Sequence, residues 1–249
     1  MKTVYLFDID GTLTDPRQKI DEIFAGIFLD WLEEGNRTVY LVTGSDIKKI
    51  RQQLFGAFLE KCAGVFCCAA NQLYENDNLI YENKFVVPPT LLEDLEIYLE
   101  EAQYKIRTGN HIEERPGMIN FSLLGQNANL LQREIYSRWD ARNGEREDVV
   151  SYITDNYPDL DASIGGTTSV DIYAKGRDKA QVIKYLRNLY PEGVRMVFVG
   201  DKTMPGGNDY PLAAALEKDP NSHWLQVESY EETRALIEYS KLFIGEAGI

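Results

Sequence analysis

The sequence predicts an α/β fold in which a parallel sheet carries helices on its faces and a smaller α+β domain is inserted. Three observations lead to this prediction. Near both ends of the chain, short apolar strand patterns alternate with amphipathic helix patterns, which is typical of a parallel sheet. Between them, strand-like segments follow one another too closely for that alternation. The chain has 249 residues and is 44% hydrophobic, enough for one large core or two smaller ones.

The first part of the chain begins with a strand pattern that ends at a cluster of carboxylates. A helix pattern follows, because apolar residues recur there at steps of three and four until Gly35. Ser45 and Asp46 then open a second helix between two apolar strands. The expected elements are strands at 3–7, 40–42 and 65–68, and helices at 20–32 and 45–55.

Residues 82–177 are predicted to form the inserted domain, which leaves 1–81 and 178–249 as the two parts of the main domain. Its expected elements are a helix at 89–98, strands near 106, 112 and 119–121, helices between 130 and 157, and strands at 162–164 and 170–172. The α/β alternation then returns, with a helix at 179–189, a strand at 196–199 and a helix after 209.

The charge of the chain argues against two classes of partner. Its 26 basic and 40 acidic residues give a net charge of -14 without a basic stripe, so we expect neither nucleic acid nor an anionic membrane. No stretch approaches the roughly 20 apolar residues of a membrane span, and the first residues lack a signal peptide's apolar region. The three cysteines have no ligand spacing and are interpreted as buried hydrophobes. We expect a cytoplasmic protein.

Asp8 and Asp10 carry the strongest functional signal, in the segment Asp8-Ile9-Asp10-Gly11 after the first strand. Two carboxylates at a strand end can both face the crevice where open α/β sheets bind ligands. One can attack phosphorus, while the other can protonate the leaving oxygen and later deprotonate the acceptor. Because a carboxylate cluster repels a phosphate dianion, a cation is needed, and oxygen ligands suit Mg²⁺. The alternative is a surface Asp-Gly turn, against which the segments further along the chain argue.

Four further segments fit the same chemistry. Thr43-Gly44-Ser45 follows a strand, Lys179 stands at an expected helix start, and Gly200-Asp201 and Asn208-Asp209 follow another strand. Hydroxyls and amides can bind phosphoryl oxygens, a lysine can neutralise charge beside the nucleophile, and late carboxylates can complete a metal shell. Taken singly, each could be a helix cap, a solvated lysine or a turn. Their order along the chain favours one shared site.

Together these segments resemble the haloacid dehalogenase (HAD) superfamily and, within it, the eukaryotic-type phosphomannomutases. The resemblance spans nearly the whole chain. Its most specific segments are Pro16-Arg17-Gln18-Lys19-Ile20 and the decapeptide from Gly200 to Asp209. The other matching segments are Asp8 to Thr14, Gly44 to Asp46, Gly117 to Asn120 and Gly176 to Lys179.

The resemblance implies a HAD Rossmann-like core with the inserted domain as a cap. Asp8 would become an aspartyl-phosphate, Asp10 would act as the acid/base, and Lys179 would neutralise charge beside them. Mg²⁺ would be held by Asp8, the Asp10 carbonyl and Asp201. Thr43 and Ser45 are predicted to bind the substrate in the same site.

The resemblance also assigns the phosphate that does not react to three arginines, here Arg17, Arg115 and Arg133. Taken alone, Arg115 and Arg133 would more often be exposed surface cations, although a bidentate guanidinium suits a phosphate dianion. The cap positions that contact the substrate correspond to Asn120, Ser169 and Asp171.

Two positions depart from the family pattern. Gln126 stands where the family usually has another cap arginine, so we expect a weaker phosphate contact there. The family's Glu-Asn-Gly loop after the third strand is here Ala70-Asn71-Gln72, of which only Asn71 carries over.

The function that follows is the interconversion of mannose 6-phosphate and mannose 1-phosphate through an aspartyl-phosphate and a hexose bisphosphate. A hexose 1,6-bisphosphate would activate the enzyme, and two caps would pair in a homodimer. The alternative is a HAD sugar-phosphate phosphatase, in which water attacks the aspartyl-phosphate. The three arginines favour the mutase, while Gln126 weakens the case. A non-catalytic binding module would require the loss of Asp8, Asp10 or Lys179, and none is lost.

Overall fold

The computed structural model describes residues 1–242 and confirms the predicted α/β class. A seven-stranded sheet has the order β11-β10-β1-β2-β3-β4-β5, in which the first five strands are parallel and β4 and β5 are antiparallel additions. Its strands are β1 (Lys2–Phe7), β2 (Thr38–Val42), β3 (Gly64–Cys67), β4 (Gln72–Glu75), β5 (Asn78–Glu82), β10 (Val194–Gly200) and β11 (His223–Gln226).

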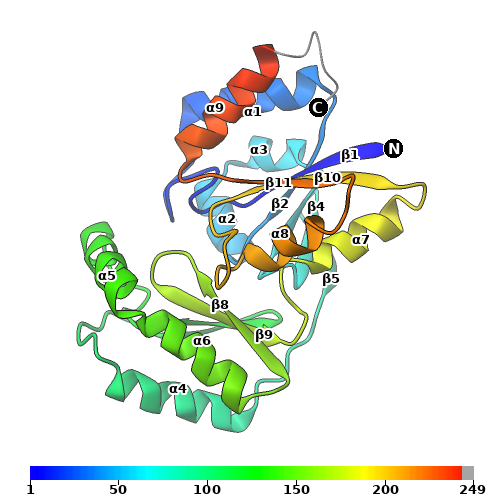
Figure 1. The fold of residues 1–249 in the computed structure, drawn as a ribbon. Coiled ribbons are helices and arrows are strands. Elements are labelled where there is room, and N and C mark those ends of the chain that lie inside the picture. Colours follow the sequence, from blue (N-terminus) through cyan, green and yellow to red (C-terminus); the bar gives the residue numbers. More distant parts are fainter. Residues whose placement is uncertain (243–249) are drawn as a thin grey trace.

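Helices cover both faces of this sheet (Figure 1). Because successive side chains of a strand point to opposite faces, Leu6 packs toward one helix layer and Phe7 toward the other. One layer consists of α1 (Glu22–Glu34), α2 (Ile47–Gln53), α3 (Gly56–Lys61) and α9 (Tyr230–Leu242). The other consists of α7 (Gln181–Leu189) and α8 (Tyr210–Leu216).

Residues 82–177, which we call the cap, contain a second sheet; the other described residues are called the core. The cap sheet has the order β6-β7-β9-β8 and is antiparallel throughout. The domain boundaries at 82 and 177 remain a prediction. They fall close to the end of β5 at Glu82 and the start of α7 at Gln181. The cap elements are α4 (Pro89–Glu101), β6 (Ile112–Arg115), β7 (Met118–Ser122), α5 (Leu130–Asn143), α6 (Glu145–Asn156), β8 (Leu160–Gly165) and β9 (Ser169–Ala174).

The two faces of the cap sheet differ in polarity. Ile119, Phe121 and Ile172 pack against the cap helices in one apolar cluster. Asn120 and Asp171 lie at alternate positions of the same strands, so they point to the opposite face, toward the core. In Figure 1 this sheet lies between the core and the cap helices. The polar face of the cap is therefore turned toward the carboxyl ends of the core strands.

Backbone hydrogen bonds join the cap to the core at β8, an edge strand of the cap sheet. The amide of Ile164 donates to the carbonyl of Gly206 at 2.8 Å, and the amide of Asn208 donates to the carbonyl of Ile164 at 3.1 Å. Gly206 and Asn208 lie in the core loop after β10. The core loop thus pairs with the cap sheet at its open edge.

Asn71 lies where the chain passes between core and cap. It is fully buried, donates to the carbonyl of Arg177 at 3.1 Å and accepts from the side chain of Asn83 at 3.2 Å. Asn83 and Arg177 belong to the two connecting segments. Asn71 therefore links the two connecting segments.

Some elements differ from the sequence-based expectations. The helix expected at 45–55 forms as α2 but ends at Gln53, because Leu54 takes an extended conformation, and the short helix α3 that follows it was not expected. No strand forms at Ile106. The hairpin of β4 and β5 was not expected; Asn76 and Asp77 both have positive φ at its turn, as a tight hairpin requires. The strand β11 was not expected either.

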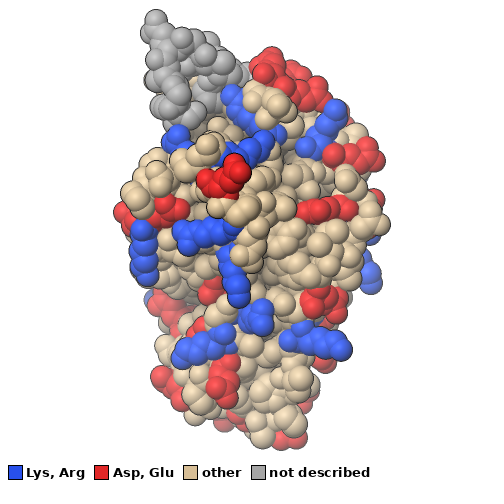
Figure 2. Space-filling view, turned by 90° about the vertical axis from the view of Figure 1, so that its right-hand side faces the viewer, with Lys and Arg blue, Asp and Glu red and all other residues tan. Residues whose placement is uncertain are grey.

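None of the described helices is long and apolar enough to cross a membrane. On the face of the molecule shown in Figure 2, basic and acidic side chains lie interspersed. The basic residues on this face therefore do not form a field of one sign.

Candidate active site

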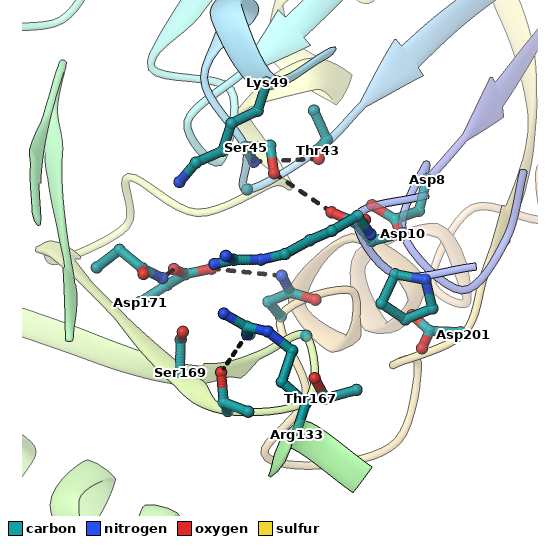
Figure 3. Close-up of a pocket in the computed structure, with 18 of the residues that line it drawn as sticks. Asp8, Asp10, Thr43, Ser45, Lys49, Arg133, Thr167, Ser169, Asp171 and Asp201 are labelled. Atoms are coloured by element: carbon teal, nitrogen blue, oxygen red, sulfur yellow. Dashed lines mark hydrogen bonds between the residues drawn. The ribbon is translucent and has the colours of Figure 1, made fainter. Parts of the chain in front are cut away.

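A polar pocket lies between the carboxyl ends of the core strands and the polar face of the cap sheet. Figure 3 shows Asp8, Asp10 and Ser45 on its core side and Arg133 and Asp171 on its cap side. Eleven of the predicted site residues line it, namely Asp8, Asp10, Arg17, Thr43, Ser45, Arg115, Asn120, Arg133, Ser169, Asp171 and Asp201. The structure thus brings together segments that are far apart in the sequence, while the role of each residue stays a prediction.

Lys179 is buried beneath the pocket between two carboxylates. Its Nζ lies 2.7 Å from Oδ1 of Asp8 and 2.6 Å from Oδ1 of Asp209, and the side chain has no exposed surface. Burial by itself lowers the pKa of Lys179, but the charges of Asp209 and Asp8 raise it above its ordinary value. Lys179 is therefore a permanent cation beside Asp8. It precedes α7 by two residues rather than opening that helix, as had been expected.

Burial raises the pKa of Asp8 well above its ordinary value. The charge of Lys179 lowers that pKa, while Asp209 and Asp201 raise it further. Carboxylate oxygens of Asp8, Asp201 and Asp209 lie within 4.8 Å of one another. Such a cluster of hard oxygen atoms suits a divalent cation, which would relieve the repulsion. A side chain at Gly11 would come within 2.6 Å of Asp201 Oδ2, so the glycine makes room for this carboxylate.

The carboxylate of Asp10 is held apart from this cluster. Its Oδ1 accepts from the backbone amide of Arg17 at 2.7 Å and from Nε2 of Gln53 at 2.8 Å. Its Oδ2 accepts from the hydroxyl of Ser45 at 3.3 Å. These donors orient the carboxyl group at the entrance to the pocket, where it can exchange a proton with a bound molecule.

The loop of Thr43 and Ser45 is fixed from two sides. Oγ1 of Thr43 accepts from the amide of Ser45 at 3.1 Å. Behind the loop, the amides of Cys68 and Ala69 donate to the carbonyls of Ser45 and Thr43, each at 3.0 Å. Cys68 and Ala69 adopt positive φ there, which costs energy for residues other than glycine. This conformation brings their amides to the loop.

Arg115 and Arg133 are buried, so their interpretation as exposed surface cations is wrong. The side chain of Arg115 is 5% exposed, and its Nη1 donates to the carbonyl of Gly44 at 2.9 Å. Arg133 donates to the carbonyls of Ala128 and Gln126 at 3.0 and 2.9 Å, and to Oγ1 of Thr168 at 2.9 Å. Burial and the nearby Arg17 lower the pKa of Arg133 to about 10. These three hydrogen-bond acceptors are neutral, which leaves the charge of Arg133 suited to an anionic ligand.

Gln126 connects Arg17 of the core with Asn120 of the cap. Its side-chain oxygen accepts from Arg17, and its backbone carbonyl accepts from the same guanidinium at 3.2 Å. Its Nε2 donates to Oδ1 of Asn120 at 2.7 Å. Gln126 does not itself line the pocket; it holds two residues that do.

Asp171 is a buried carboxylate enclosed by amides and glycines. It accepts from Asn120 at 2.7 Å and from Asn208 of the core at 3.4 Å. A Cβ at Gly44 or Gly165 would come within 2.7 or 2.6 Å of its Oδ2. The absence of side chains at these glycines therefore lets core and cap approach this carboxylate.

Comparison with known proteins agrees with this arrangement. The eukaryotic phosphomannomutase family model matches residues 28–242. The chain belongs to this family. A phosphomannomutase of Encephalitozoon cuniculi is 32% identical over 259 residues, which cover 100% of this chain and 97% of that protein. One of Dendrobium officinale is 33% identical over 219 residues, which cover 84% of each chain.

Solved structures of lower sequence identity share the fold. The protein SMU.1108c of Streptococcus mutans has a TM-score of 0.66 and 13% identity, and the match covers 97% of this chain and all (100%) of that one. The IMP-nucleotidase of Plasmodium falciparum has a TM-score of 0.59 and 17% identity, over 95% of this chain and 67% of that one. These likenesses confirm the predicted HAD-type fold.

The structure also reveals contacts that the motifs did not point to. Lys49 lines the pocket, and Gln53 donates to Asp10. Both lie on α2, one and two turns beyond Ser45, so the three- and four-residue helix spacing could have suggested that they face the same site. Glu113, which contacts Lys49 and Arg115, carries no comparable signal, because its partners come together only when the cap meets the core.

Proposed function

We propose that this chain is a phosphomannomutase that interconverts mannose 6-phosphate and mannose 1-phosphate. The observation that carries the proposal is a pocket with phosphate-binding groups at both ends. Asp8, supported by Lys179, lies at the core end, and the buried Arg133 lies at the cap end. A hexose with a phosphate at either carbon can then present one phosphate to Asp8 and leave the other end of the molecule to the arginines.

The phosphoryl group would be transferred to a carboxylate oxygen of Asp8. As the bond from phosphorus to the sugar oxygen breaks, Asp10 gives its proton to that oxygen; in the return step Asp10 takes the proton of the attacking hydroxyl. Lys179, held 2.7 Å from Asp8, offsets negative charge beside the reacting atoms. Asp10 is oriented for this exchange by Gln53 and Ser45.

Mg²⁺ is the cation that we propose for the carboxylate cluster. Asp8, Asp201 and the carbonyl of Asp10 would hold it. Both oxygens of Asp209 already accept hydrogen bonds, from Lys179 at 2.6 Å and from the amide of Lys202 at 3.0 Å, so Asp209 serves better as the counter-ion of Lys179. The ion supplies positive charge that offsets repulsion between the carboxylates and a phosphate.

The phosphate that does not react would be bound by Arg17, Arg115 and Arg133, with Asn120, Ser169 and Asp171 near the sugar. Gln126 supports this set by holding Arg17 and Asn120 rather than by contributing a charge. A hexose 1,6-bisphosphate would activate the enzyme by phosphorylating Asp8. Fewer charges at the far end would let this intermediate escape more easily, so we expect a strong dependence on added activator.

A homodimer formed through the caps and a cytoplasmic location remain proposals that rest on the family resemblance. They do not enter the chemistry of the pocket. Size-exclusion chromatography with light scattering would test the first, and cell fractionation the second.

A coupled assay tests the reaction. Mannose 1-phosphate is supplied with and without a hexose 1,6-bisphosphate, and both hexose 6-phosphate and free phosphate are measured. We expect hexose 6-phosphate as the main product, with a rate that rises when the bisphosphate is added. Free phosphate as the main product would instead identify the alternative, a sugar-phosphate phosphatase.

A further inference from the structure

Glu113 lies where the cap meets the core and takes no part in the proposed chemistry. It is on β6, two residues before Arg115, so both side chains project from the same face of the strand. Its Oε2 accepts from Nε of Arg115 at 2.9 Å and from a terminal nitrogen of the same guanidinium. Two donors of Arg115 are thus fixed by one carboxylate oxygen, which restricts the orientation of the guanidinium.

The same oxygen binds a lysine of the core. Nζ of Lys49, on α2, lies 2.7 Å from Oε2 of Glu113. This ion pair joins core and cap, whereas the pair of Arg146 and Asp140 stays within the cap. Burial and the charge of Arg115 lower the pKa of Lys49, while Glu113 raises it. Lys49 therefore depends on Glu113 for compensation of its charge.

Arg115 also contacts the core, at the loop that carries Thr43 and Ser45. Its Nη1 donates to the carbonyl of Gly44 at 2.9 Å. Without Glu113, the charges of Arg115 and Lys49 would be brought together in a partly buried site with no anion between them, which is unfavourable. The carboxylate of Glu113 therefore favours the closed arrangement of cap and core.

We propose that Glu113 is a positioning residue that couples closure of the cap to the orientation of Arg115. In the closed arrangement Glu113 binds Lys49 across the junction and at the same time turns the guanidinium of Arg115 toward the loop of Gly44. When the cap moves away, Lys49 is lost from this set and Arg115 loses its contact with Gly44. The proposal rests on the proposed function only in taking Arg115 as a phosphate contact, and closure can be measured without substrate.

Distances between spin labels on cap and core test the coupling. Labels are placed on cysteines introduced at the exposed positions Glu96 of α4 and Glu192 before β10. The three native cysteines are buried, and burial raises the pKa of Cys62 to about 12, so they resist labelling. We expect Lys49→Met and Glu113→Gln each to raise the ratio of open to closed molecules about threefold to tenfold.

Matched controls come from the neighbouring exposed residues of the same charge. Lys48→Met and Glu114→Gln should leave the distance distribution unchanged, and Lys49→Arg should preserve closure. The double variant of Lys49→Met and Glu113→Gln should open no more than either single variant, because each removes the same ion pair. Additive effects, or distributions equal to those of the controls, would overturn the proposal.

A second measurement separates this inference from the proposed function. Glu113→Gln should raise KM for mannose 1-phosphate about tenfold and increase the free phosphate formed per hexose 6-phosphate, because Arg115 is less well oriented and the cap seals less completely. If the distances change but mannose 1-phosphate is not a substrate of the parent protein, the proposed function fails while the coupling stands. If the parent is an active mutase and Glu113→Gln changes neither distance nor KM, the coupling fails alone.

Discussion

The carboxylate of Asp8 is buried beside Asp201 and Asp209, and this crowding has a consequence for stability. The pKa values of Asp8 and Asp201 are raised chiefly by burial. A raised pKa means that the folded state holds protons more tightly than the unfolded state. The contribution of these groups to the free energy of unfolding therefore decreases as the pH rises from the ordinary pKa near 3.8 toward their raised pKa values, and the protein loses stability over this range.

Asp8→Asn removes one of the crowded charges. We expect turnover to fall by more than about a thousandfold, because an amide cannot serve as the nucleophile. Without metal, the variant should equal or exceed the parent in free energy of unfolding, and its advantage should grow as the pH rises above the ordinary carboxyl pKa near 3.8. Urea denaturation at several pH values in the presence of a chelator measures this difference.

Addition of Mg²⁺ provides the complementary test of the Asp8 site. The parent should gain thermal stability, because a ligand that binds only the folded state stabilises it, and Asp8→Asn should gain less. Equal gains in both proteins would show that Asp8 does not contribute to the metal site. In the urea measurements, a difference in unfolding free energy between Asp8→Asn and the parent that shrinks with rising pH would contradict the raised pKa of Asp8.

Arg133 offers a test of the far phosphate site. Arg133→Met should weaken the binding of mannose 1-phosphate about tenfold to a hundredfold, since charged hydrogen bonds are worth roughly 1.5 to 3 kcal/mol. Titration calorimetry measures the affinity directly. Hydrolysis of a small phosphate ester, which cannot reach the cap end, should change much less.

Arg138 on the same helix is the matched control for that substitution. Its side chain is 75% exposed and pairs with Glu134 on the surface. Arg138→Met should leave the affinity within a factor of two or so, as expected for a surface pair. If Arg133→Met slowed hydrolysis of the small ester as strongly as the mutase reaction, Arg133 would be supporting the fold.

Two glycines govern how closely the loop after β2 and the strand β8 approach Asp171. Gly44→Ala and Gly165→Ala would each place a Cβ within 2.7 Å of Oδ2 of Asp171. Asp171 is 2% exposed and cannot move aside freely. We expect each variant to lose about 1 to 3 kcal/mol of unfolding free energy, and Gly44→Ala, which also separates core from cap, to lose more mutase activity.

Gly26 in the middle of α1 is the control at this scale. A Cβ there would meet nothing within 4 Å, and the residue is exposed. Gly26→Ala should therefore stabilise the protein by about 0.5 to 1 kcal/mol through the helix preference for alanine. Thermal denaturation of the three variants side by side checks the contrast. Equal effects at Gly26 and Gly44 would mean that the close approach to Asp171 is not limiting.

The elements differ in how well the sequence predicted them. The strands that end just before Asp8 and Asp201 were expected because their apolar runs end abruptly in carboxylates. The turn at Asn76 and Asp77 has a local signal, because Asn and Asp are the residues that best tolerate positive φ in turns after glycine. The burial of Arg115 and Arg133 had no local signal, since an arginine looks the same in sequence whether water or a cap covers it. Contacts that form only between cap and core, such as that of Glu113, depend on the meeting of two separate sheets.

At the scale of the whole molecule, Gln126 is a contact between core and cap. Gln126→Arg would place a second guanidinium against Arg17, which repels it in the free protein and cooperates with it when a phosphate lies between them. We expect a lower melting temperature without ligand and a larger increase on addition of mannose 1-phosphate than in the parent. Thermal shift measurements with and without the ligand test this.

The assay of the two products completes the test of Gln126. The variant should need less hexose 1,6-bisphosphate and should form more hexose 6-phosphate for each free phosphate released. Phosphorylation of Asp8 itself should not change. An unchanged product ratio, together with an unchanged response to mannose 1-phosphate, would mean that the charge at this position does not reach the substrate.

The backbone hydrogen bonds between Ile164 and the core loop at Gly206 and Asn208 make movement of the cap measurable in the native protein. Whenever the cap swings away, the amides of Ile164 and Asn208 lose their acceptors and meet water. Their deuterium uptake should then follow the fraction of molecules in which the cap is open, while amides within the strands of either sheet exchange only on deeper unfolding. Hydrogen exchange at these two amides therefore measures the opening of the cap in the native protein, without any label or substitution.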